Sequence, residues 1–492
     1  MNSKTIMGLL KKYKFVLFIF LFTTLFFIIQ HQFTISWDFI SYVLNAKNMF
    51  NSGLYFETFR PPLTSFIIGL FAQILGYAAA EIIYIIIVSA LFCLSIILIS
   101  KQLNFNTELF YLILFTPFVL YFGQINGTEL LSVALLLLGI YFIIKNNWIS
   151  GLFIGFSALT RYTGIVFGVI LLFHKGIDKK IKSIILFCLT FIPWFIYSKL
   201  KFGNFFTSIA DQYHQNITSR LDIAQAPKLI HFISVQSILF VFTLIGLLYI
   251  LYKLIKKNKN AKPLNNSFSI IMLLLTIYTI HTYFSTPFKD MRYLFTLMLP
   301  IGYFTYVGIT SIAEKIKKHK IKLHRIYLIT IYILLIFSVL ISSIKILEET
   351  YKLDYPYITR YKNAINTIYK NNLEDCVMYS DAWTFYNYLD SNIIMLPIEI
   401  YIKDIPNYQD KVLFLYTPTR SKEQIIALEN QLPTIIKTNN IMILGDLKNC
   451  KLKENYVELF YIHNSLYTNP CNILFNKIKP IENICYFINS EK

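Results

Sequence analysis

The sequence predicts an α-helical protein that crosses a membrane many times and carries a small α/β domain at its C-terminal end. Three observations predict this fold. Of the 492 residues, 55% are hydrophobic and only 15% are charged, whereas about a quarter of the residues of a soluble domain are charged. Apolar runs long enough to cross a bilayer recur up to residue 345 and then stop. Short β-type runs alternate with helical stretches after that point.

Nine apolar runs in the first 345 residues have the length that a transmembrane helix needs. They lie at 15–33, 80–100, 105–122, 128–145, 181–200, 232–252, 268–285, 292–311 and 325–345. We expect the first run to stay as an anchor, because it is long and is followed by further spans. With two less regular apolar segments, 62–78 and 151–173, the pattern predicts about 9 to 12 membrane segments.

The net charge of +19 would suggest a nucleic-acid partner in a soluble protein. Here the basic residues gather between the spans, and Lys and Arg accumulate in cytoplasmic loops. The clusters are 4–14, 175–182, 253–262 and 315–325. The charge therefore reports topology and predicts no nucleic-acid partner. We expect a multi-pass protein of the cell membrane, with a cytoplasmic N-terminus and an extracytoplasmic C-terminal domain.

The two less regular segments decide on which side the next residues emerge. If 62–78 crosses fully, Glu129 lies on the cytoplasmic side and Lys101 outside; if it lies at the interface or re-enters, the two exchange sides. The charge rule favours the second arrangement. By the same rule, 151–173 is expected to form a hairpin of two short helices with Arg161 at an outward-facing tip. Irregular backbone at membrane depth is tolerated around a polar cavity, so this hairpin indicates a site.

Two domains are predicted, a catalytic transmembrane domain at 1–345 with its first outer loop at 34–61, and an extracytoplasmic α/β domain at 346–492. Helices are expected in the second at 358–369 and 422–432, and strands at 377–379, 393–396, 412–416 and 441–444. Four cysteines of this domain can form disulfides in an oxidising compartment, in three alternative pairings. They are Cys376, Cys450, Cys471 and Cys485. No cysteine or histidine cluster has metal-ligand spacing, so we expect no zinc site. Because the candidate carboxylates are single and scattered, we expect no metal cofactor.

A helix is predicted in the first outer loop. Ser36 can cap its N-terminus, and Asp38 lies in its first turn. Asp38, Tyr42 and Asn45 share one face, at i, i+4 and i+7. Apolar residues form the other face, so we expect the helix to lie in the membrane interface with its apolar side down. Asp38 is then either a carboxylate that favours the helix dipole or a functional acid just above the bilayer.

Five further charges are expected near the outer face: Glu57, Arg60, Glu129, Arg161 and Arg292. Ionisable residues at membrane depth are costly and usually face a cavity, although a capping carboxylate or an interfacial anchor is the alternative for Glu129 and Arg292. The guanidinium fork suits phosphate. Acids for proton abstraction and arginines for a phosphate leaving group suggest transfer from a lipid phosphate.

Six motifs in order give the sequence a resemblance to a known group. They are the Trp37-Asp38 helix, Arg60-Pro-Pro-Leu63, Glu129 at the start of a span, Gly151-Leu-Phe-Ile-Gly-Phe-Ser-Ala-Leu-Thr-Arg161, Phe202-Gly-Asn204 and Arg292-Tyr-Leu294. Together they resemble the GT-C superfamily of polyprenyl-phosphate-sugar glycosyltransferases. The nearest groups would be those like protein O-mannosyltransferases and lipid A aminoarabinose transferases, in glycosyltransferase families 39 and 83. The tail from residue 346 is not covered by the resemblance.

The resemblance implies an integral-membrane, inverting enzyme that transfers one sugar from a dolichyl or undecaprenyl phosphate to a protein, lipid or glycan on the outer face. It implies that Asp38 is the catalytic general base and that Glu129 is its acidic partner. Arg161, Arg292 and Arg60 would bind the donor phosphate. Three further candidates for contacts with the substrate are Tyr42, Glu57 and Tyr293.

Two other functions are alternatives. A polytopic transporter or lipid flippase with no covalent chemistry would also have many spans and intramembrane charges, but no inverted repeat is detectable. A phosphoethanolamine or acyl transferase would need a nucleophile with metal ligands or a His-acid dyad, and the eight histidines show no such motif in an outer loop. The sequence does not identify the sugar or the acceptor.

Overall fold

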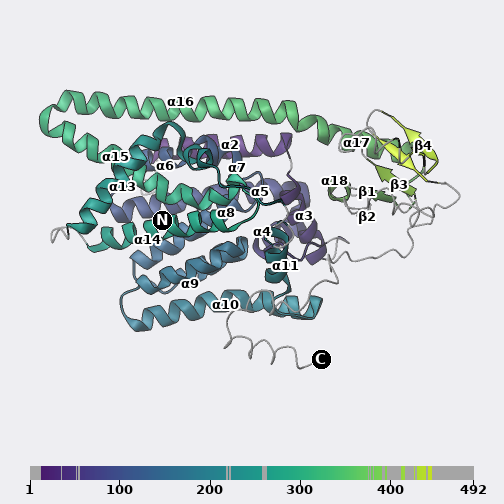
Figure 1. Cartoon of the computed structure of the whole chain (residues 1–492), viewed down its shortest axis with the longest axis horizontal. Helices are drawn as coiled ribbons and strands as arrows, with labels where there is room; N and C mark the ends of the chain where they lie inside the picture. Colours follow the sequence, from purple (N-terminus) through teal and green to yellow (C-terminus); the bar gives the residue numbers. More distant parts are fainter. Residues whose placement is uncertain are drawn as a thin grey trace.

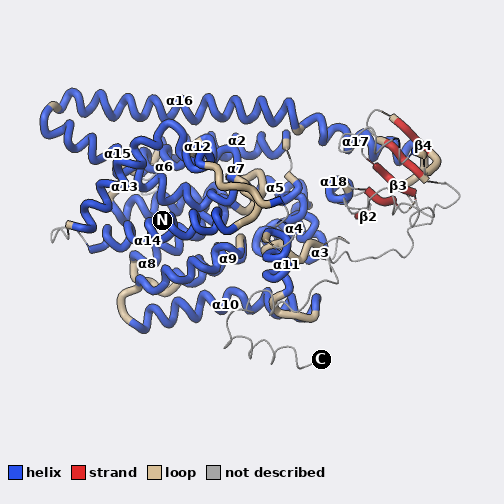
Figure 2. Tube along the Cα trace, viewed as in Figure 1, coloured by secondary structure: helices blue, strands red, loops and turns tan. Residues whose placement is uncertain are grey.

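The structure is a computed structural model that describes residues 13–445, with gaps at 35, 51–52, 54–55, 218–219, 221–222, 257–262, 375, 377, 381, 390–393, 396–411, 416–425, 427–428, 431 and 439–440. Its helices pack into one bundle, and its strands gather beyond one end of that bundle (Figure 1). In Figure 2 the strands, in red, are confined to this end.

The helices of the bundle follow one another along the chain with short connections. They are α2 (Lys14–Phe33), α3 (Trp37–Met49), α4 (Pro62–Leu75), α5 (Tyr77–Leu103), α6 (Thr107–Leu114), α7 (Pro117–Phe122), α8 (Glu129–Ile144), α9 (Ser150–Thr160), the 3-10 helix η1 (Tyr162–Phe173), α10 (Ile177–Phe202), α11 (Thr207–Asn216), α12 (Leu229–Gln236), η3 (Ser237–Leu239), α13 (Phe240–Ile255), α14 (Pro263–Ser285), η4 (Met291–Leu297), α15 (Met298–His319) and α16 (Ile321–Leu353).

Six helices of the described residues are long and apolar enough to cross a membrane. They are α2, α5, α10, α14, η4 with α15, and α16 with its continuation to Lys370. A seventh arises if α12 and α13 count as one span, although they are bent by 93°. The predicted runs at 15–33, 80–100, 181–200, 268–285, 292–311 and 325–345 thus correspond to long helices.

Two predicted spans were wrong as continuous helices. The run 105–122 is divided into α6 and α7, because Pro117 begins α7 and the hydroxyl of Thr116 caps it by accepting from the Val119 amide at 3.4 Å. Proline cannot donate a helix hydrogen bond, and it disfavours helical geometry at the residue before it. The run 232–252 is divided where Ser237 adopts a φ of 51°.

The two less regular segments are short helices. α4 has 14 residues, about 21 Å at 1.5 Å per residue, which is less than the ~30 Å hydrocarbon core. It ends at Gly76, whose φ of 78° turns the chain into α5, and it packs against α3 and α5. The segment 151–173 is divided at Arg161 into α9 and η1, which pack against each other as a hairpin requires.

The C-terminal part is a small α/β unit, as the sequence predicts. It contains α17 (Tyr355–Lys370), β1 (Met378–Ser380), α18 (Trp383–Tyr388), β2 (Ile394–Met395), β3 (Val412–Leu415), β4 (Thr434–Lys437) and β5 (Met442–Leu444). The strand order is β2-β1-β3-β5-β4, with β1 parallel to β2 and β3 and the other pairs antiparallel. The sequence did not predict β4. The expected helix at 422–432 lies mostly outside the described residues.

The helical bundle and the C-terminal part are joined by a continuous helix. Helix α16 runs without a break through the predicted boundary at 345. Cys376 is disulfide-bonded; the other three tail cysteines lie outside the described residues. The boundary at 345 and 346 therefore stays a prediction.

Helix α3 is buried on both of its apolar faces. Phe39, Val43 and Ala46 belong to the core of the helical bundle. Ile40 and Leu44 belong instead to the core of the C-terminal part. The C-terminal part covers the side of α3 that carries Ile40 and Leu44, and the position of this helix in the membrane interface stays a prediction.

Candidate active site

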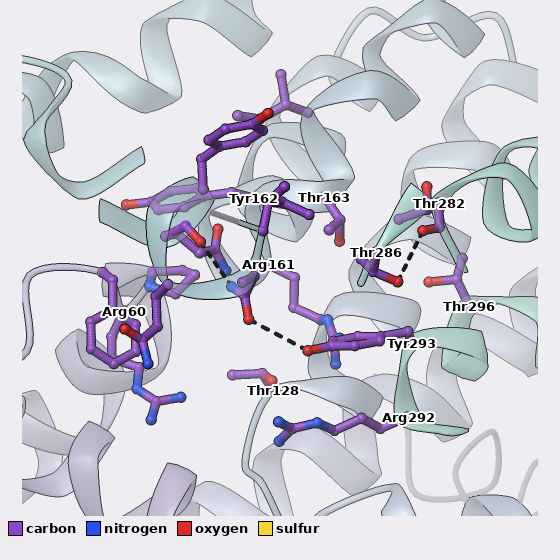
Figure 3. Close-up of a pocket in the computed structure, with 18 of the residues that line it drawn as sticks. Arg60, Thr128, Arg161, Tyr162, Thr163, Thr282, Thr286, Arg292, Tyr293 and Thr296 are labelled. Atoms are coloured by element: carbon purple, nitrogen blue, oxygen red, sulfur yellow. Dashed lines mark hydrogen bonds between the residues drawn. The ribbon is translucent and has the colours of Figure 1, made fainter. Parts of the chain in front are cut away.

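A cavity of about 630 Å³ lies where α3, the turn before α4, the hairpin at Arg161, α11, α14 and η4 meet. Its wall contains seven of the eight residues singled out from the sequence. They are Asp38, Tyr42, Arg60, Glu129, Arg161, Arg292 and Tyr293. Glu57 is outside the wall and only 2% exposed. Figure 3 shows Arg60, Arg161 and Arg292 entering this pocket from different elements.

Asp38 lies between two arginines at the start of α3. Ser36 begins this helix by accepting a hydrogen bond from the Phe39 amide at 3.1 Å. Asp38 Oδ1 lies 2.7 Å from Arg60 Nη1, and its Oδ2 pairs with Arg292. Burial alone would raise the pKa of Asp38, but the charges of Arg60 and Arg292 outweigh it and hold the pKa well below its usual range. The side chain is therefore a carboxylate at physiological pH.

Arg60 is held by a second carboxylate and by two rings. Its Nε donates to Glu57 Oε2 at 2.6 Å, and its guanidinium lies 5.6 Å from the ring centre of Tyr42 and 4.7 Å from that of Phe59. Pro61 is extended and leads into α4, so the chain direction after Arg60 is fixed. Glu57 thus contacts Arg60 from behind and does not reach the cavity.

Arg292 has a similar arrangement on the opposite side. Asp290 caps η4 by accepting from the Arg292 amide at 2.9 Å, and its Oδ2 lies 2.9 Å from Arg292 Nε. Each of these two arginines therefore lies between Asp38 and one further carboxylate. Asp290 was not among the sequence candidates, although it lies only two residues before Arg292.

Glu129 and Arg161 form an ion pair at another edge of the cavity. Glu129 begins α8, is 2% exposed and also accepts from the amide and hydroxyl of Thr128 at 3.3 and 3.2 Å. Arg161 lies at the break between α9 and η1. The sequence predicted both residues at the site but did not predict that they pair.

Tyr42 contributes a neutral phenol to the wall of the cavity at physiological pH. Burial raises its pKa to about 12, so the phenol keeps its proton. Tyr42 lies one turn after Asp38 and faces the same cavity.

One polar wall of the cavity was missed by the sequence analysis. It comes from α11 and the segment after it, with Gln212, Gln215, Asn216 and Arg220. Arg220 Nη1 donates to the Tyr293 hydroxyl at 3.3 Å, and that hydroxyl donates to Asn216 Oδ1 at 3.4 Å. No ion pair joins Arg220 to a carboxylate within the described part of the chain. Isolated amides and an arginine in a polar segment carry no sequence signal that separates them from solvated loop residues.

No group of three or more His, Cys, Asp or Glu side chains suited to a metal ion occurs among the described residues. The carboxylates nearest the cavity pair with arginines. The expectation of a metal-independent site therefore stays a prediction.

Comparison with known proteins was decisive for the fold. Residues 59–277 match the model of glycosyltransferase family 87. ArnT from Cupriavidus metallidurans bound to undecaprenyl phosphate superposes with a TM-score of 0.62 at 10% identity, over 87% of this chain and 97% of that one. The apo state of the same protein gives 0.62 and 10%, over 90% and 98%. The chain is a membrane glycosyltransferase with the GT-C fold. The curated proteins contain no significant sequence match.

The two comparisons confirm the GT-C resemblance and the multi-pass architecture that the sequence predicts. The matching family model is that of family 87, whereas the sequence resemblance named families 39 and 83. The matched range contains Arg60, Glu129 and Arg161 but ends before Arg292 and begins after Asp38. Neither comparison supports the transporter alternative.

Proposed function

We propose that this glycosyltransferase transfers a single sugar from a dolichyl or undecaprenyl phosphate to a protein, lipid or glycan acceptor, with inversion at the anomeric carbon. The observation that carries the proposal is the Asp38 carboxylate, which lies between Arg60 and Arg292 in the wall of the cavity. The undecaprenyl phosphate bound to the fold relative is consistent with it.

The charge balance of the cavity suits an anionic donor. Four arginines line it, against the two carboxylates of Asp38 and Glu129. Arg220 adds a guanidinium that is not already paired with a described carboxylate. A polyprenyl-phosphate sugar is a phosphodiester with one negative charge, and arginine binds phosphate oxygens with two parallel hydrogen bonds.

The proposed reaction is one displacement. The Asp38 carboxylate takes the proton of the acceptor hydroxyl while that oxygen forms a bond to the anomeric carbon. The bond between the anomeric carbon and the phosphate oxygen breaks, and polyprenyl phosphate leaves with the electron pair. The phosphate gains one negative charge in this step, so the arginine groups stabilise the transition state more than the bound donor.

Donor binding also changes Asp38. The two guanidinium groups suppress its basicity. A phosphodiester anion at the same guanidinium groups competes for their hydrogen bonds and adds a negative charge nearby, so the pKa of Asp38 rises when the donor binds. The carboxylate is therefore a stronger base in the donor complex.

We place this site at the outer face of the cell membrane, with a cytoplasmic N-terminus and an extracytoplasmic C-terminal domain. The proposal rests on the basic clusters between the spans. Its check is the accessibility of single introduced cysteines in sealed vesicles, at Lys317 for the inside and at Tyr369 for the outside.

The test of the activity uses purified protein in liposomes with a polyprenyl phosphate that carries a labelled sugar. A transferase releases polyprenyl phosphate and gives a labelled covalent product when a hydroxyl acceptor is present. Movement of intact labelled lipid between leaflets without a covalent product would contradict the proposal and favour a flippase.

A further inference from the structure

Helix α3 joins the reaction site to the C-terminal part of the chain. Asp38 and Tyr42 face the cavity, whereas Ile40 and Leu44 are built into the apolar core that contains Trp383. Helix α18 packs against α3. The C-terminal part can therefore act on the reaction site through the contact between α18 and α3.

Trp383 contacts the first residue of α3. Its ring centre lies 5.4 Å from that of Trp37, with the ring planes 89° apart, and Phe385 makes a second edge contact with Trp37 at 6.0 Å. Trp383 is 2% exposed. Such edge-to-face contacts restrict the orientation of both rings.

A hydrogen-bonded path leads from Trp37 to the carboxylate. Trp37 Nε1 donates to Glu57 Oε1 at 3.4 Å, and Glu57 Oε2 accepts from Arg60 Nε at 2.6 Å. The Glu57 backbone is fixed as well, because its amide donates to Asn45 Oδ1 at 2.7 Å and its carbonyl accepts from Asn45 Nδ2 at 2.9 Å. Arg60 then contacts Asp38 at 2.7 Å.

A second contact holds α18 in the same place. The Tyr388 hydroxyl donates to Glu81 Oε2 at 2.8 Å, and the same oxygen lies 2.8 Å from His31 Nε2. The Tyr388 carbonyl accepts from Lys47 Nζ of α3 at 3.4 Å. Helices α3 and α5 thus contact the end of α18 directly, and His31 of α2 shares the Glu81 carboxylate with Tyr388.

We propose that Trp383 is a positioning residue for the transfer reaction: through Trp37 and Glu57 it orients the Arg60 guanidinium on Asp38. The C-terminal part then helps to hold the side chains of the active site in place. The inference rests on the proposed role of Asp38. Loss of the Trp383 ring frees Trp37 to rotate, Glu57 loses one donor, and Arg60 moves away from Asp38.

The test compares Trp383→Ala, Arg60→Gln and the double variant with the wild-type protein in the transfer assay. We expect Trp383→Ala to lower kcat about tenfold, within the range that a small misplacement of a catalytic group costs. In the Arg60→Gln background the same substitution should have less than about a twofold effect, because its route to Asp38 is already removed. Equal losses in both backgrounds would overturn the proposal.

The pH profile gives a readout that a merely structural role would not move. Because Arg60 lowers the pKa of Asp38, misplacing Arg60 shifts the acid limb of kcat/KM to higher pH. Trp383→Phe, which keeps a ring, should restore both the rate and the limb. Tyr369→Ala is the matched control, an exposed aromatic residue of α17, and should leave both unchanged. An unshifted limb in Trp383→Ala would contradict the proposal.

A substitute variant and a measurement of unfolding complete the test. If Trp383→Ala does not fold, Trp37→Phe keeps the ring and removes only the indole donor to Glu57, and it should produce the same shift. The unfolding temperatures of the four proteins of the cycle measure the coupling without any reaction. If the unfolding temperatures show coupling between Trp383 and Arg60 but the wild-type protein transfers no sugar, only the transferase proposal is refuted. If the wild-type protein is active but the effects of the two substitutions are additive, only the positioning role of Trp383 is refuted.

Discussion

The carboxylate of Asp38 and the guanidinium of Arg292 form an ion pair across 254 residues of sequence. Asp38 lies in the first turn of α3, and Arg292 lies in η4. The folding of the bundle therefore brings the proposed base and a proposed phosphate ligand together. The pairing also explains why the carboxylate can remain ionised although it is buried.

The pH dependence of the reaction should report the Asp38 environment. In the wild-type protein the pKa of Asp38 is depressed, so kcat/KM should show no loss of this carboxylate between pH 5 and pH 8. Arg60→Gln removes one of the two positive charges, so the pKa of Asp38 rises and the acid limb moves to higher pH. Initial rates measured from pH 8 down to the lowest pH at which both proteins stay folded show this movement. Arg325→Gln, at an exposed site, is the control, and an identical limb in both variants would contradict the assignment.

The Glu129 and Arg161 pair should contribute to stability. Glu129 is 2% exposed at its side chain and Arg161 19%, so removal of one partner leaves a largely buried charge, at a cost of about 2 kcal/mol after allowance for the exposure of Arg161. Unfolding free energies of Glu129→Gln, Arg161→Gln and the double variant should show coupling. The exposed pair Glu348 and Lys352 supplies the control cycle. Equal coupling in the two cycles would show that the buried pair has no special role.

The contact between α13 and α15 depends on two glycines. A Cβ at Gly246 would lie 1.8 Å from the Phe304 carbonyl oxygen, and one at Gly308 would lie 2.1 Å from that of Phe242. Small residues allow such close approach of membrane helices. Gly246→Ala should therefore cost about 1 to 3 kcal/mol or more, measured as a lower unfolding temperature. Leu248→Ala, at a position of α13 that is 67% exposed, should change little; a similar loss in both would contradict the packing argument.

Donor binding can be tested without the sugar. Polyprenyl monophosphate at 100 times its Kd should stabilise the protein by about 2.7 kcal/mol, seen as a higher unfolding temperature. Polyprenol of the same length should do so much less, because it lacks the group that the arginines bind. Arg292→Gln should reduce the difference between the two lipids. Equal stabilisation of the wild-type protein by both would argue against a phosphate site.

The sequence identified candidate site residues where a charged residue occurs within an apolar segment. Single charges in apolar surroundings are conspicuous, so Asp38, Arg60, Glu129, Arg161 and Arg292 could be found before their positions in space were known. Their pairing could not, because the order of residues along a chain does not say which helices touch.

Other features left weaker signals. Pro117 is a sequence signal for the break between α6 and α7. The apolar run on both sides of it nevertheless has the length of one continuous span, and this length led to the wrong prediction. The strand Thr434–Lys437 has polar ends and only two apolar residues, so it does not stand out from a loop. The burial of α3 depends on the C-terminal part, which lies more than 300 residues away in the sequence and leaves no local mark on the helix.

The transfer rate of Asp38→Asn tests the central claim most directly. Substitution of a general base typically costs about 100-fold to 10,000-fold in rate, and the amide keeps the shape of the side chain. Asp178→Asn, at an exposed carboxylate of α10, is the matched control. With a polyprenyl-phosphate-linked sugar as donor, we predict that Asp38→Asn folds and loses at least 100-fold in kcat while Asp178→Asn retains wild-type turnover. Full turnover by a folded Asp38→Asn protein would contradict the account.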